Sequence, residues 1–173
     1  LKENNNSIAM VVAGKNHLKK NYSILPLSGI SNQETIHCNE NGYYAIYQSD
    51  RYGFNNPDKE WDNEDIEYLL IGDSYTHGAC VNRPNDIGSV LRTLSNKSVL
   101  NLGYSGNGPY FNYATMREYF NSNMKKVLWI HYEGNDLGDL KYNKNNKYLA
   151  KYIEDLNFSQ NLKLKQKKIN EIN

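Results

Sequence analysis

The chain has 173 residues, enough for one domain with a substantial hydrophobic core. Its 20 Lys and Arg against 19 Asp and Glu give a net charge of +1, so bulk charge does not favour nucleic acid or an anionic membrane. The longest apolar runs are too short to span a bilayer, and no signal-peptide pattern is visible. Two cysteines, Cys38 and Cys80, are too few for a disulfide scaffold, and the sequence leaves open whether they pair.

Residues 1–65 are predicted to form an irregular N-terminal extension that precedes the main fold. Residues 1–21 give no clear pattern, whereas residues 22–50 alternate short β-like runs with turns. One of these turns is Asn41-Gly42, where both residues tolerate positive φ. We expect the extension to lie across the edge of the main sheet. The alternative is that it lines the substrate cleft.

From residue 66 onward the sequence alternates between strand and helix patterns. Apolar runs predict strands at 68–71, 98–102 and 126–132. Helical spacing predicts helices at 84–94, with Pro84 in the first turn, at 110–120 and at 148–156. Residues 137–146 are predicted to be loop, and the Lys-rich tail 162–173 a solvated helix or a frayed end. This alternation indicates an α/β fold of parallel βαβ units with right-handed crossovers.

Polar and glycine-rich segments follow each of the three predicted strands. Gly72 permits a sharp turn after the first strand, and Asp73 and Ser74 are both preferred helix N-cap residues. The second strand leads into a glycine-rich turn at 103–109, and the third into Gly134-Asn135-Asp136. The carboxyl ends of parallel strands lie at one edge of a sheet, so these loops are expected to meet there. Taken singly, each has a structural explanation, but together they predict a serine nucleophile with donors for an oxyanion.

These segments resemble three sequence blocks of the SGNH (GDSL-type) hydrolases. The matching segments are Gly72-Asp73-Ser74, Asn101-Leu102-Gly103-Tyr104-Ser105-Gly106-Asn107 and Gly134-Asn135-Asp136. The resemblance covers roughly residues 43–140, and segment 50–57 is similar to segments of bacterial members from envelope or polysaccharide contexts. It implies a flavodoxin-like α/β/α sandwich around a five-stranded parallel sheet. It also implies that Ser74 is the nucleophile, that Gly106 and Asn135 supply oxyanion donors, and that Asp73 orients the turn.

One departure from the family concerns the catalytic base. The last family block, an Asp three residues before a His, is absent, and no His follows His131. We expect truncation to explain this, with residues 66–173 holding the first three strands of an incomplete hydrolase-like domain that is inactive alone. His77 and His131, the latter placed inside the third strand, are the local substitutes, and we interpret both as structural. His17 and His37 precede the fold and are weaker candidates.

The resemblance predicts a serine esterase or lipase-type hydrolase, or an O-acyltransferase, that acts on an ester such as an acetylated glycan. The alternative is a non-catalytic glycan-binding or envelope polysaccharide assembly module that uses the same pocket. A nucleotide binder is disfavoured because no Gly-x-Gly-x-x-Gly or P-loop follows the first strand. The implied partner is a small-molecule or glycan ester; no metal, organic cofactor or nucleic acid is implied. The cell envelope is favoured over the cytoplasm by resemblance, and the oligomeric state is left open.

Overall fold

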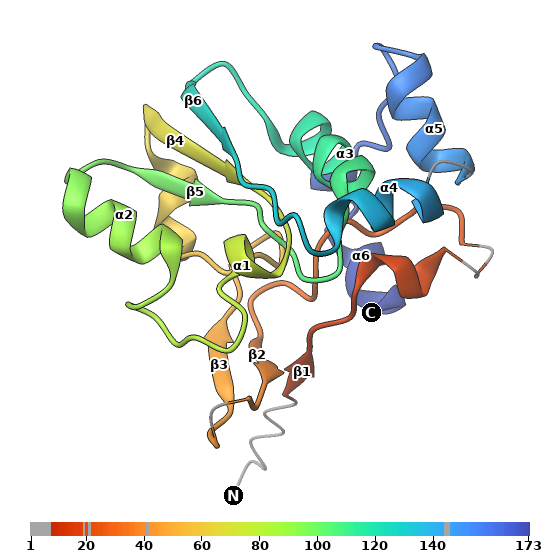
Figure 1. Ribbon diagram of the computed structural model, residues 1–173. Coiled ribbons are helices and arrows are strands. Elements are labelled where there is room, and N and C mark those ends of the chain that lie inside the picture. Colours follow the sequence, from red (N-terminus) through yellow and green to blue (C-terminus); the bar gives the residue numbers. More distant parts are fainter. Residues whose placement is uncertain (1–7, 19, 21, 41, 144–145) are drawn as a thin grey trace, which may run out of the picture.

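A three-stranded parallel sheet forms the centre of the molecule. The computed structural model describes residues 8–18, 20, 22–40, 42–143 and 146–173. The strands lie in the order β5-β4-β6, with β4 (Ile66–Ile71) between β5 (Val99–Asn101) and β6 (Met124–Trp129) (Figure 1). Strand β4 is apolar and fully buried at its C-terminal end, as is usual for the inner strand of a parallel sheet. The predicted α/β class and the three parallel strands are therefore confirmed.

Helices cover both faces of this sheet (Figure 1). The first three are α1 (Ser74–His77), α2 (Ile87–Ser95) and α3 (Pro109–Tyr119). Successive residues of a strand point to opposite faces. Accordingly, Leu69 belongs to the buried cluster that contains Phe111 of α3, while Leu70 lies beside Val90 of α2.

Two predicted boundaries around these helices are wrong. Helix α2 begins at Ile87 because the Asp86 carboxylate accepts a hydrogen bond from the Ser89 N–H, as an N-cap does. Pro84 therefore precedes the helix, and its peptide bond with Arg83 is cis. Strand β6 ends at Trp129, so His131 lies in the following loop rather than inside the strand.

Most of the polar segment predicted as loop is instead part of helix α4 (Asp136–Asn143), and positions 144 and 145 of that segment lie outside the described residues. The Asp136 carboxylate accepts a hydrogen bond from the Tyr132 N–H, which closes the turn that leads into the helix. Asp139 packs closely against Gly108 at the start of α3, where a larger residue would collide with it. Packing against α3 thus outweighs the polar composition that favoured a loop.

The C-terminal tail packs against the rest of the protein rather than extending into solvent. It follows α5 (Lys147–Glu154) and consists of the short helix η3 (Leu162–Lys165) and α6 (Gln166–Ile172). Leu162 and Ile169, seven residues apart, are fully buried on one side of this tail. The Asn173 amide also donates a hydrogen bond to the Ser28 carbonyl, so the prediction of a solvated tail is wrong.

The N-terminal extension forms a small second sheet of order β1-β2-β3. Its strands are β1 (Ala9–Met10), β2 (Glu34–Cys38) and β3 (Ala45–Gln48), and two short helices, η1 (Gly14–His17) and η2 (Asp58–Asp62), flank them. β2 and β3 are antiparallel, and Gly42 in the turn between them has φ +81°. Asn41 of the predicted turn lies outside the described residues, as do residues 1–7, 19 and 21 of the segment without a clear pattern.

This extension shares one core with the central sheet. Ile24, Leu27 and Phe54 belong to the same buried cluster as the strand residues. Asn56 donates a hydrogen bond to the Asn101 carbonyl and accepts one from the Asn101 N–H at the end of β5. A disulfide joins Cys38 of β2 to Cys80 after α1, which answers the question of pairing. In the described part of the chain, no helix is long and apolar enough to cross a bilayer.

Candidate functional site

Ser74 lies directly after the central strand, as the sequence predicts. The Asp73 side chain, which is almost fully buried, accepts a hydrogen bond of 3.2 Å from the Tyr75 N–H and is the N-cap of α1. Ser74 is consequently the first residue of this helix, and its side chain is half-buried. Helix α1 has only four residues and ends at Gly78, whose φ is +82°. This geometry supports the predicted role of Asp73 in orienting the turn.

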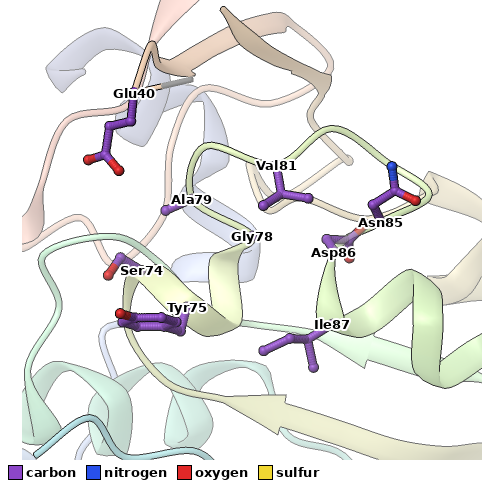
Figure 2. Close-up of a pocket in the computed structure, with 9 residues that line it drawn as sticks. All are labelled: Glu40, Ser74, Tyr75, Gly78, Ala79, Val81, Asn85, Asp86 and Ile87. Carbon is purple, nitrogen blue, oxygen red and sulfur yellow. The ribbon is translucent and has the colours of Figure 1, made fainter. Parts of the chain in front are cut away.

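Two cavities meet at Ser74. The first, with a volume of about 380 Å³, lies over α1 and the loop that leads to α2, where it is lined by Tyr75, Val81 and Ile87 (Figure 2). The second, of about 320 Å³, lies between the N-terminal extension and the loop after β5. Glu40, which faces Ser74 from the N-terminal extension in Figure 2, lines both cavities. A hydroxyl at the junction of two cavities can react with a group held across them.

The second cavity brings Ser74 together with Gly106. Gly106 adopts φ +75°, a conformation that favours glycine. Among the described residues, neither the Ser74 N–H nor the Gly106 N–H donates to a protein acceptor. Both donors are therefore free to bind a ligand oxygen. Asn135, the third predicted donor, is exposed in the turn after β6 and lines neither cavity.

His77, the last residue of α1, holds the loop after β5 in place. Its Nδ1 accepts a hydrogen bond of 3.0 Å from the Ser105 N–H, so Nε2 carries the proton and donates to the Tyr47 hydroxyl, also at 3.0 Å. The ring stacks on Tyr104 with 4.9 Å between centroids. Burial, with a smaller effect from His37, lowers the pKa of His77 well below its usual value. These contacts confirm the interpretation of His77 as a structural, neutral histidine.

Two other histidines also lie away from the cavities. The exposed ring of His131 stacks on Trp129, and its Nδ1 lies 3.4 Å from a carboxylate oxygen of Asp136. His17 is buried, and its Nε2 lies 3.1 Å from the side-chain oxygen of Asn173. Each of these rings is explained by the contacts it makes within the fold.

His37 is the cavity residue to which the sequence analysis gave too little weight. It lines the second cavity together with Ser74, and its Nε2 lies 2.5 Å from the Ser105 hydroxyl oxygen. Desolvation lowers its pKa to about 4. The pairing of Cys38 with Cys80 would have revealed this position, because it draws His37 to the end of α1. The alternative that the extension lines the cleft therefore describes the structure better than a position across the sheet edge.

Within the described ranges, no group of three or more His, Cys, Asp or Glu side chains could hold a metal ion. The cavities offer hydroxyl groups, backbone N–H donors, one imidazole, the carboxylates of Glu40 and Asp86 and the Lys15 ammonium, a polar set suited to an uncharged carbonyl compound. The fold and the site thus define an α/β protein with a polar cavity at the carboxyl edge of a parallel sheet. Searches found no matching family model, curated protein or solved structure.

Proposed function

We propose that this protein is an SGNH-type serine hydrolase or O-acyltransferase that acts on an ester, with Ser74 as the nucleophile. One observation carries the proposal: Ser74 and Gly106, which come from two separate sequence blocks, line one cavity and have unpartnered N–H groups. An SGNH site requires this juxtaposition, because the nucleophile and the oxyanion donors must face the same carbonyl.

In the proposed reaction, the Ser74 hydroxyl oxygen attacks the ester carbonyl carbon. The developing oxyanion accepts hydrogen bonds from the N–H groups of Ser74 and Gly106, and Asn135 adds its amide once the turn after β6 closes on the substrate. The Ser74 proton passes to a histidine base of the Asp-x-x-His type, which the resemblance implies, and that base protonates the departing alcohol. The resulting acyl-serine is then cleaved by water or a sugar hydroxyl with the same base. The two cavities on either side of Ser74 suit the acyl and alcohol portions of such an ester.

A second candidate function is non-catalytic binding of a glycan in the same cavities. It is favoured by the absence, among the described residues, of any side chain that hydrogen-bonds the Ser74 hydroxyl. A serine without a base in contact is a weak nucleophile at neutral pH. In the SGNH family the base comes from an Asp-x-x-His block.

A fluorophosphonate probe distinguishes the two functions. We expect the probe to label Ser74 of the intact protein, and Ser74→Ala to abolish labelling at that position. The matched control is Ser89→Ala, since Ser89 lies in the first turn of a helix with an Asp N-cap but outside both cavities. A folded wild-type protein that is not labelled at Ser74, yet binds glycans, would favour the binding module.

A further inference from the structure

A second serine on the cavity wall has the contact that Ser74 lacks. The Ser105 hydroxyl oxygen lies 2.5 Å from His37 Nε2, within hydrogen-bond contact. Both residues line the 320 Å³ cavity, and Ser105 is only half-buried, so its hydroxyl is open to a ligand. A nucleophile in hydrogen-bond contact with a potential base is the basic unit of covalent catalysis by serine.

The remaining contacts hold this pair in place from both sides. The His37 ring lies 4.3 Å from the ring of His77, and the edge of Tyr47 packs at 6.5 Å. The disulfide of Cys38 anchors the backbone next to His37. On the other side, the bond from the Ser105 N–H to His77 fixes the serine. The two functional groups are thus oriented by residues that take no part in the reaction.

The protonation of His37 is compatible with the role of a base. Burial keeps the pKa of the ring at about 4, so the ring is neutral at physiological pH. Its Nδ1 is buried without a partner among the described residues, and Nε2 is the nitrogen that contacts Ser105. A base of this pKa is weak. We therefore expect it to serve reactions with activated acyl or phosphonyl groups better than reactions with simple alkyl esters.

We infer that Ser105 and His37 form a second nucleophile–base pair, which accepts an acyl group from an activated ester in this cavity. The bond from the Ser105 oxygen to the carbonyl carbon forms as the hydroxyl proton passes to His37 Nε2. The ester C–O bond then breaks, and the leaving alcohol takes that proton. Gly106 directly follows Ser105, and its unpartnered N–H is in the position from which an oxyanion donor commonly acts. Water releases the acyl group by the same steps in reverse.

Peptide mapping of the probe-labelled protein tests this inference independently of Ser74. Trypsin cleaves after Arg92 and Lys97, so Ser74 and Ser105 fall on different peptides. We expect the intact wild-type protein and Ser74→Ala to be labelled at Ser105, and Ser105→Ala to lose that label. Replacing the base by His37→Gln should slow labelling at Ser105 by about 10²-fold or more. Ser98→Ala is the matched control, because Ser98 lies on the same peptide and, among the described residues, its hydroxyl bonds only the Asp65 carbonyl and the Glu67 N–H.

The outcomes separate this inference from the proposed function. A label on Ser74 without one on Ser105 overturns the second pair and supports the proposed function. A label on Ser105 without one on Ser74 supports the second pair and counts against Ser74 as the nucleophile. Labelling of Ser105 that is unchanged in folded His37→Gln also overturns it, because the hydrogen bond would then be purely structural. If His37→Gln does not fold, as judged by circular dichroism, mapping of wild type and Ser74→Ala decides the question.

Discussion

The loops that follow β5 and β6 leave the same edge of the sheet and both contain a predicted oxyanion donor, but they are held very differently. In the β5 loop, the Gly103 N–H donates to the Asn101 side chain, and Asn107 accepts a hydrogen bond from the Gly14 N–H. His77 of α1 accepts a hydrogen bond from the Ser105 N–H of this loop, and His37 of the N-terminal extension contacts the Ser105 hydroxyl. The β6 loop has residues 131–135 exposed, and its main contacts are the turn closed by Asp136 and a ring contact between Tyr132 and Tyr75.

This difference shows that the N-terminal extension packs against one of the two loops and leaves the other exposed. Gly106 belongs to a loop that is packed on two sides, so its N–H is preorganised. Asn135 is exposed in the β6 loop, which makes none of these contacts with the extension. Four experiments test this contrast.

The largest effect is expected from removal of the disulfide that fastens the extension beside the β5 loop. The two cysteines are 42 positions apart, and the chain-entropy relation assigns about 4 kcal/mol to a loop of that length. The Cys38→Ser/Cys80→Ser variant should unfold at a clearly lower temperature than wild type. Thermal unfolding followed by circular dichroism, with and without reductant, measures this change. Reductant should affect wild type only; an unchanged wild-type melting temperature in reductant would show that the extension docks without the crosslink.

Next in size is the effect of Asn135→Ala on the catalysis proposed for the intact protein. Loss of one oxyanion donor raises the activation barrier by about 3–4 kcal/mol, or roughly 10²–10³ in kcat. Because Asn135 is exposed, the melting temperature should not change. Steady-state kinetics with an activated acetate ester measures the effect, and Glu133→Ala in the same exposed turn is the control. A reduction of kcat below about threefold would make Asn135 a turn residue without a part in catalysis.

A pair of glycine substitutions compares the packing of the β5 loop with that of helix α4, which follows the β6 loop. A Cβ at Gly103 would lie 2.6 Å from the His77 backbone nitrogen, whereas one at Gly138 in α4 would meet nothing within 4 Å. Gly103→Ala should destabilise the protein by about 1–3 kcal/mol through overpacking. Gly138→Ala should be neutral or stabilising by up to about 1 kcal/mol, since alanine favours helix. Urea unfolding of both variants tests the contrast, and equal effects would contradict it.

The smallest expected effect is a pH dependence of stability that comes from the two histidines in contact with the β5 loop, His37 and His77. Burial lowers the pKa of His37 from 6.5 to about 4 in the folded state, so the unfolded chain binds a proton more readily. Stability should therefore fall as the pH drops below 6.5 towards 4, by about 1 kcal/mol between pH 7 and 5.5 for this one group. His77 acts with the same sign. Denaturant melts over this range should show a weaker slope for His37→Gln, and an identical slope would assign the effect to other groups.

Elements whose cause lies in neighbouring residues could be predicted from the sequence. The apolar run before Gly72 defines β4, the turn chemistry of Asp73 sets the start of α1, and the glycines after β5 define a tight loop. Since strands joined by helices run parallel, the order of these segments was enough to bring Ser74 and Gly106 to one edge. Both now line the same cavity.

Which distant segments cover that edge could not be predicted from the sequence and is seen in the folded structure alone. Ser105 and His37 are 68 positions apart, and α6 docks on a segment about 140 positions away. No local periodicity encodes such contacts, because they depend on how surfaces fit once the sheet has formed. For the same reason, the polar segment of α4 and the Lys-rich tail were assigned to solvent from their composition. In both cases a few buried or closely packed side chains, such as Asp139 against Gly108 and Ile169 in the core, outweighed the polar majority.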